Sequence, residues 1–232
     1  MPQINEILSW IENHSVAVDL LKWSLVLLLA WVSGAFKLLR LLTKRPKLKV
    51  SEIVSACAIL REPHDERENA EKAIFLLNLE VVNPSRTLVV INSLEMKFAS
   101  TRPFWKRTNW ISAVSLPSRV RIEMGAGTKV MRNWFAHFPD EIAELTVDGR
   151  IEPNDAQSGY ALFVTHTFGS WNPKVLDGAV RVTCRALSAT GDKVNASGQI
   201  PVMTDPDRLE VMVPGVLDQA RHPSSWNIPA RF

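Results

Sequence analysis

The stretch from Thr101 to Trp110 is the part of the chain best equipped to bind another molecule. It reads T-R-P-F-W-K-R-T-N-W, so three aromatic rings and three cations lie within ten positions. Tryptophan and arginine dominate the binding energy of protein interfaces. Aromatic rings beside cations are also typical of membrane interfaces and of single-stranded nucleic-acid sites. The candidate interaction residues are Arg102, Phe104, Trp105, Lys106, Arg107 and Trp110. The alternative is a plain connection between strands, with tryptophans that cap the core.

The remaining reactive residue types do not form a recognisable catalytic, metal or cofactor pattern. The five histidines are scattered, and the chain has no C-x-x-C pair. Gly125 to Thr128 follows an alternating segment, but no helix with a lysine comes next, which favours a hairpin turn over a phosphate loop. We therefore expect no metal, no cofactor and no enzymatic activity.

Alternating apolar and polar residues predict that β-strands position the segment 101–110. Phe75, Leu77, Leu79 and Val81 are expected on one face, with the polar Asn78 and Glu80 on the other. A turn follows at Asn83-Pro84-Ser85, and alternation resumes up to Phe98. Further alternating sets begin at Val120, Leu145, Tyr160, Val180 and Val194, and the segments near 47–60 and 129–138 are weaker. The pattern predicts a mainly β domain over residues 46–203, an antiparallel β-sandwich of immunoglobulin-like architecture, with a barrel as the alternative closure.

The two cysteines and the C-terminal segment complete the expected domain. Cys184 lies on the inward face of its strand, and Cys57 is expected on the same face as Ile53 and Ile59. Each is predicted to be a buried, reduced side chain. Residues 204–232 are rich in proline and polar residues, so an extended C-terminal tail is expected there.

The apolar run between Leu20 and Leu42 predicts a membrane anchor in front of this domain. Its uncharged centre, Trp23 to Phe36, reaches only about 21 Å as a helix, less than the roughly 30 Å of a hydrocarbon core. Spanning therefore requires the flanking lysines and arginines to extend toward the headgroups. The anchor residues are Lys22, Trp23, Trp31, Lys37, Arg40, Lys44 and Arg45.

The sequence thus predicts a transmembrane helix and basic flank over residues 20–45, after a short amphipathic segment over residues 1–19. Basic residues concentrate on the C-terminal side of the run, so the N-terminus is expected outside and the β-domain in the cytosol, as in a bacterial inner membrane. A cleaved signal peptide, an interfacial helix and a buried helix are the alternatives.

The predicted anchor segment and the domain differ in net charge, and this difference limits the classes of partner that the domain can bind. The chain has 27 basic and 24 acidic residues, of which five basic and three acidic residues lie in residues 1–45. Residues 46–232 therefore hold 22 basic and 21 acidic residues and are close to neutral. A nucleic-acid-binding domain usually carries a basic excess, so nucleic acid is not expected as a partner.

The expected function is that of a membrane-anchored binding or scaffold module in a membrane-associated complex. Its expected partners are the lipid bilayer and a protein or a second copy of the chain. The alternative is a signal-responsive membrane effector of the bacterial defence type, in which the β-domain senses and the helix acts on the bilayer.

Overall fold

The computed structural model describes residues 15–34, 45–61, 70–102, 109–124, 127–135 and 149–221. The chain divides into two compact units, Met1–Lys44 and Arg45–Phe232. Each unit is described by itself below.

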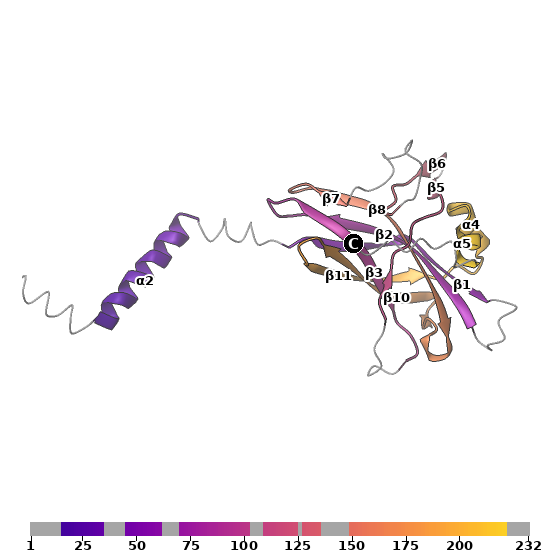
Figure 1. Ribbon diagram of the computed structural model, residues 1–232, viewed down its shortest axis with the longest axis horizontal. Helices are drawn as coiled ribbons and strands as arrows, with labels where there is room; N and C mark the ends of the chain where they lie inside the picture. The colour runs from indigo at the N-terminus through magenta and orange to yellow at the C-terminus, as the bar shows by residue number, and fades with distance from the viewer. Residues whose placement is uncertain are drawn as a thin grey trace, which may run out of the picture. The chain divides into compact units, whose positions relative to one another are not determined.

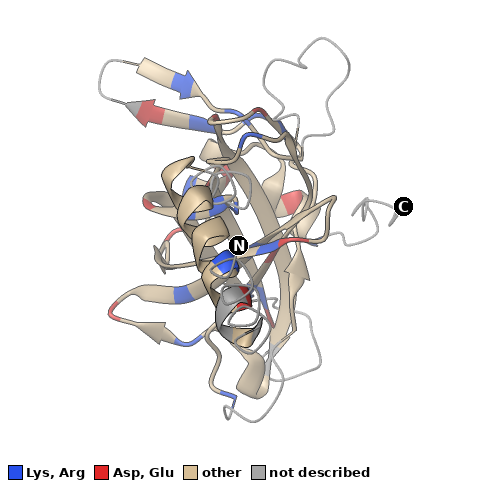
Figure 2. Ribbon diagram, turned by 90° about the vertical axis from the view of Figure 1, so that its left-hand side faces the viewer, with Lys and Arg blue, Asp and Glu red and all other residues tan. Residues whose placement is uncertain are grey.

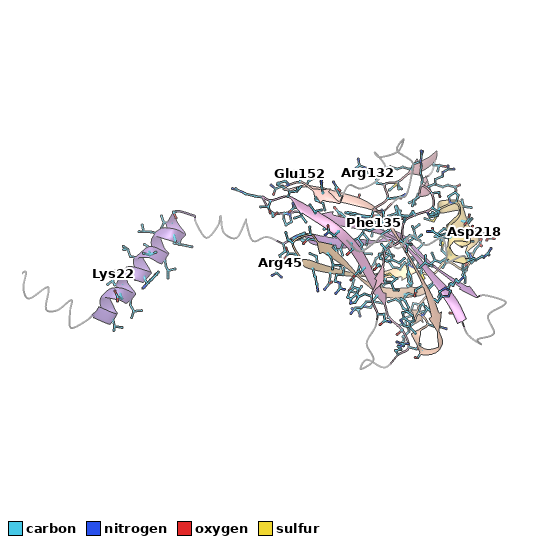
Figure 3. The ribbon with its side chains drawn as sticks, in the orientation of Figure 1. Lys22, Arg45, Arg132, Phe135, Glu152 and Asp218 are labelled. Atoms are coloured by element: carbon cyan, nitrogen blue, oxygen red, sulfur yellow. The ribbon has the colours of Figure 1, made fainter. Side chains whose placement is uncertain are left out.

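The described part of the first unit, residues 15–34, contains the helix α2 (Ser15–Val32), shown in Figure 1. Leucine, valine and tryptophan side chains lie on every side of α2, and those of Trp23, Leu25 and Trp31 are all more than half exposed. The side chain of Lys22 pairs with Asp19 at 3.3 Å (Figure 3). None of the helices in the described ranges combines the length and the apolar character needed to cross a bilayer.

Only some of the predicted anchor residues can be placed. Lys22, Trp23 and Trp31 lie on α2, Arg45 lies just before the first strand, and Lys37, Arg40 and Lys44 are outside the described residues.

The second unit is built mainly from β-strands (Figure 1). The long strands are β1 (Lys47–Arg61), β2 (Ala70–Val82), β3 (Val89–Phe98), β8 (Ala156–Phe168), β10 (Ala179–Ser188) and β11 (Lys193–Pro201). The short elements are β4 (Ile111–Ser112), β5 (Arg121–Met124), β6 (Gly127–Val130), β7 (Arg150–Ile151), the 3-10 turn η2 (Gly169–Trp171), β9 (Val175–Leu176), α4 (Asp207–Met212) and α5 (Val216–Arg221).

The strands form two main sheets and one hairpin, and every pairing between these strands is antiparallel. Sheet 1 has the order β1-β2-β8, and sheet 2 has the order β11-β10-β3-β4, with β7 beside β3 and β9 beside β10. Strand β5 pairs with β6 from Arg121 opposite Val130 to Met124 opposite Gly127, as the predicted hairpin requires, and Gly125 and Ala126 lie outside the described residues. The prediction of a mainly β, antiparallel fold is therefore confirmed.

A first core lies between the two sheets. Alternating residues of β3 and β10 point into it, among them Leu94, Met96, Val182 and Cys184, as their period of two predicted. Phe75 and Phe163 face them from sheet 1. The indole of Trp134 enters the same core and donates a hydrogen bond to the Leu79 carbonyl at 3.0 Å.

A second core lies on the opposite face of sheet 1. Ile74, Leu76, Leu162 and Val164 of β2 and β8 are buried there, against Leu116, Val120 and the two C-terminal helices. Strands β2 and β8 of sheet 1 are therefore buried on both faces. This agrees with the continuous apolar runs Ile74-Phe75-Leu76-Leu77 and Ala161-Leu162-Phe163-Val164, which are typical of strands covered on both sides.

Residues 207–221 form α4 and α5, in place of the extended chain that we expected there. The helices bury Leu209, Val213, Val216, Leu217 and Ala220 against sheet 1. The carboxylate of Glu210 accepts the N–H groups of Gly215 and Leu217 at the start of α5. The buried Lys72 ammonium donates to the Arg221 carbonyl at its end, at 3.1 Å. A helix of six residues has too few turns for its apolar spacing to be recognised in the sequence, and prolines lie close to both helices.

A bulge in β1 overturns the predicted position of Ile53. Residues 52–55 of β1 lie opposite Leu77 alone, because the register shifts between Ser51 and Ala56. The side chain of Ile53 is 96% exposed as a result, so it does not share a face with Cys57. The Ser55 hydroxyl accepts the N–H of Asn78 at 2.9 Å, which replaces a lost strand hydrogen bond.

Cys57 and Cys184 are free and fully buried, as predicted. Burial raises the pKa of the Cys184 thiol to about 12, because the apolar core disfavours the thiolate. The same cause raises the pKa of Cys57 further. Both side chains therefore act as small core residues.

Loss of apolar area in the second core should destabilise the domain. Replacing Leu209, which is fully buried on α4, with alanine is expected to lower the free energy of unfolding by about 2–4 kcal/mol. The matched control is Val211→Ala on the same helix, where the side chain is 65% exposed and the expected change is within about 0.5 kcal/mol. Denaturant unfolding measures both, and equal effects would contradict the packing of α4 on sheet 1.

Candidate functional site

The interaction loop, residues 101–110, connects β3 to its neighbour β4 in sheet 2. Strand β4 pairs with β3 through Met96 opposite Ile111 and Glu95 opposite Ser112, so the loop leaves and returns to the same edge of the sheet. Phe104, Trp105, Lys106 and Arg107 lie outside the described residues, whereas Arg102 and Trp110 are described. The two ends of the loop are therefore what the structure places.

Trp110 is held at the C-terminal end of the loop by cations from two strands. The guanidinium carbon of Arg185, on β10, lies 3.9 Å from the centre of the Trp110 ring. The ammonium of Lys97, on β3, lies 5.1 Å from it. Such contacts attract a cation to the electron-rich face of the ring.

The carboxylate of Glu95 fixes Arg185 beneath the ring. Glu95 accepts the Nε–H of Arg185 at 2.9 Å and also an Nη2–H. Both side chains are only 19% exposed, so water screens this pair less than a surface pair. Glu95, Arg185 and Trp110 thus form one linked cluster across β3, β10 and the loop.

Arg102 is held at the N-terminal end of the loop by a second aromatic group. Its guanidinium carbon lies 5.5 Å from the centre of the Trp171 ring, and Trp171 stacks on Phe98 with ring centres 6.0 Å apart. Phe98 in turn stacks on Phe75 at 5.5 Å, which continues the stack into the first core. The loop is therefore tied to the core at one end and to the outer surface of sheet 2 at the other.

Hydrogen bonds to backbone carbonyls strengthen the attachment at the N-terminal end of the loop, beside Arg102. The Thr101 hydroxyl donates to the Ser170 carbonyl at 2.9 Å, and the N–H of Lys174 donates to the Ala99 carbonyl at 2.8 Å. Two buried polar atoms at this place, Arg102 Nε and Asn172 Oδ1, have no hydrogen-bond partner among the described residues. They offer one donor and one acceptor to a water molecule or a bound group.

The outer surface of sheet 2 is polar and carries more cations than anions. Outward positions of β3, β10 and β11 hold Lys97, Arg181, Arg185 and Lys193, and the one carboxylate among the outward residues of these three strands is Glu95. We call these four cations the basic face. The remaining outward residues are mostly hydroxyl and amide side chains, such as Thr183 and Ser197, which hydrogen-bond at 3.1 Å.

The segment with α4 and α5, on the opposite side of the domain, carries more anions than cations. Residues 205–221, which include α4 and α5, hold Asp205, Asp207, Glu210 and Asp218 against two arginines, Arg208 and Arg221. Figure 2 shows lysine and arginine in blue and aspartate and glutamate in red along the ribbon, and Figure 3 labels Asp218. This acidic excess belongs to the segment alone, because Arg121 and Lys129 lie on the β5–β6 hairpin on the same side of the domain.

The described residues bring together groups suited to binding. No cluster of three or more potential metal ligands occurs among them. His166 is exposed on β8, and the other four histidines lie outside the described ranges. The sequence pattern identified Arg102 and Trp110, but it missed Glu95, Lys97, Trp171 and Arg185, which hold them. The outward positions of Glu95, Lys97 and Arg185 were visible in the alternation, whereas the pairing of β3 with β10 and the position of Trp171 on η2 were not.

Comparisons with known proteins do not indicate a family or a function for the chain. No protein-family model and no curated protein matches the chain. Several solved structures resemble it weakly, and three of them are described. The X-ray structure of Northeast Structural Genomics Consortium target SoR45 has 10% identity and a TM-score of 0.29, covering 68% of this chain and 86% of its own. The putative ApaA protein from Bordetella pertussis has 8% identity and a TM-score of 0.27, covering 70% and 98%. The Iho670 flagellar-like filament has 12% identity and a TM-score of 0.23, covering 83% and 98%. Likenesses this weak carry no argument about function.

Removing the charge of Glu95 should loosen the Trp110 cluster. Glu95→Gln leaves the Arg185 guanidinium, whose side chain is 19% exposed, beside a neutral partner. The free energy of unfolding should therefore fall by about 1–3 kcal/mol. The control is Glu80→Gln, whose pair with Lys49 has side chains 37% and 63% exposed and should contribute less than about 1 kcal/mol. Thermal or denaturant unfolding compares the two, and an unchanged stability of Glu95→Gln would remove the cluster as a structural element.

Proposed function

We propose that this chain is a membrane-anchored binding or scaffold module, a subunit of a membrane-associated complex whose β-domain lies in the cytosol. The observation that carries the proposal is the attachment of the interaction loop at both ends, through Arg102 on Trp171 and Trp110 on Arg185. Fixing both ends of a loop that is rich in aromatic and basic residues lowers the entropic cost of binding a partner through it.

The proposed fold within this function is an immunoglobulin-like β-sandwich. Two antiparallel sheets with a shared core support it, as does the position of the loop at the end of β3. In sandwiches of this kind, loops at the strand ends are common binding sites, because the sheets hold them rigidly. We infer binding without catalysis, since the side chains gathered at the loop are cations and aromatic rings rather than an acid, base or nucleophile set.

The proposed anchor is a single transmembrane helix that includes α2. Its support is the apolar surface that α2 presents on every side, which is typical of a helix surrounded by other apolar groups or by lipid. The basic residues that follow it, from Lys37 to Lys49, support an external N-terminus and a cytosolic domain. Tethering raises the local concentration of the loop near other membrane proteins.

The test is detergent co-purification of the full chain with identification of the captured proteins. Trp105→Ala combined with Arg107→Ala should reduce capture of the specific partner by at least about tenfold, because each residue type can contribute 2 kcal/mol or more as a hot spot. The matched control is Arg121→Ala combined with Val130→Ala, a cation and an apolar residue exposed on the β5–β6 hairpin. The control variant should capture the partner normally. Unchanged capture by the loop variant would refute the loop as the interaction site.

A further inference from the structure

The two sheets of the domain differ in how their outer surfaces are covered. The outer surface of sheet 1 lies under the second core, formed with α4, α5 and the segment that carries Leu116 and Val120. The outward residues of β10 and β11 are exposed or half-buried, and neither of the two buried clusters draws on them. Among the described residues, the outer surface of β10 and β11 is therefore left uncovered by both cores.

The charged residues of this surface are mostly cations. Lys97, Arg181, Arg185 and Lys193 supply four positive charges, and Glu95 supplies one negative charge that is already paired with Arg185. None of the large apolar side chains that are exposed in the second unit belongs to an outward position of β3, β10 or β11. Same-face residues repeat at about 7 Å along a strand and about 5 Å between strands, so the cations form a broad array rather than a pocket.

Those properties favour one class of ligand over the others. The centre of a protein interface is usually depleted of charge and needs buried apolar anchors, which this surface lacks. Single-stranded nucleic acid needs aromatic rings free for base stacking, whereas the aromatic ring at the border of this surface, Trp110, already stacks on Arg185. A surface of repeated negative charges, such as phospholipid headgroups, matches a wide array of cations without requiring a pocket.

We propose that the basic face docks the domain on the anionic phospholipid headgroups of a bilayer. This inference rests on the proposed membrane anchor, which would keep the domain within reach of the lipid surface. The hydroxyl and amide groups between the cations, such as Thr183 and Asn195, add hydrogen-bonding groups for phosphate oxygens. The helices α4 and α5, which pack on the outer face of sheet 1, then face away from the headgroups.

Vesicle co-sedimentation tests the docking with a domain that starts at Arg45. Residues 45–232 contain every member of both buried cores, so this part of the chain holds its own folding determinants. It should bind vesicles of phosphatidylcholine with phosphatidylglycerol, bind phosphatidylcholine alone far more weakly, and lose binding as salt rises.

Charge reversal locates the surface. Arg181→Glu combined with Lys193→Glu should weaken binding to the anionic vesicles by about 25-fold or more, at about fivefold for each charge removed. Both positions are exposed, and the melting temperature checks that the fold is kept. The control is Arg121→Glu combined with Lys129→Glu on the β5–β6 hairpin, which makes the same change in net charge on the side of the second core. It should weaken binding much less.

Three results would overturn the inference. They are no binding to anionic vesicles, equal weakening by both pairs of substitutions, and binding to a single-stranded oligonucleotide in preference to the vesicles. The anchor is judged separately, on the full chain. If only the docking proposal is wrong, the full-length protein with Arg181→Glu and Lys193→Glu still stays in the membrane fraction. If the anchor proposal is wrong, the unsubstituted full chain is found in the soluble fraction.

Discussion

Burial of β2 and β8 on both faces is the constraint on which the rest of the domain depends. Ile74 and Leu76 point away from the first core, so they need a second apolar layer, and α4, α5 and the segment around Leu116 provide it. That layer is held by specific polar contacts, including Glu210 at the start of α5 and the buried Lys72 at its end. The C-terminal helices are therefore part of the folded domain.

The same constraint makes the domain one-sided. Sheet 1 is covered on its outer surface, whereas the outward residues of sheet 2 carry the basic face and the Trp110 cluster. The interaction loop emerges from the uncovered sheet, between β3 and β4. Both of the surfaces that we propose to bind other molecules thus belong to sheet 2, and the cations Lys97 and Arg185 connect them.

Local patterns predicted the strands well and the contacts between them poorly. The period of two placed the inward residues of β3 and β10 and the buried cysteines correctly, because burial on one face leaves a direct signature. The bulge that exposes Ile53 depends on Ser55 and on the register with β2, which no local pattern encodes. For the site, Arg102 and Trp110 were recognisable by type, but the partners that hold them come from strands distant in sequence. The sequence pattern did not predict the short helices α4 and α5, because prolines surround them.

Salt extraction of membranes tests the central claim, that an apolar anchor and an electrostatic surface hold the same chain on a bilayer. An apolar anchor is insensitive to ionic strength, whereas docking through the basic face is screened by salt. We predict that the full chain stays in the membrane pellet through a high-salt wash, while a chain that begins at Arg45 sediments with membranes at low salt and is released at high salt. Release of the full chain by salt alone, or sedimentation of the shorter chain at every salt concentration, would contradict the account.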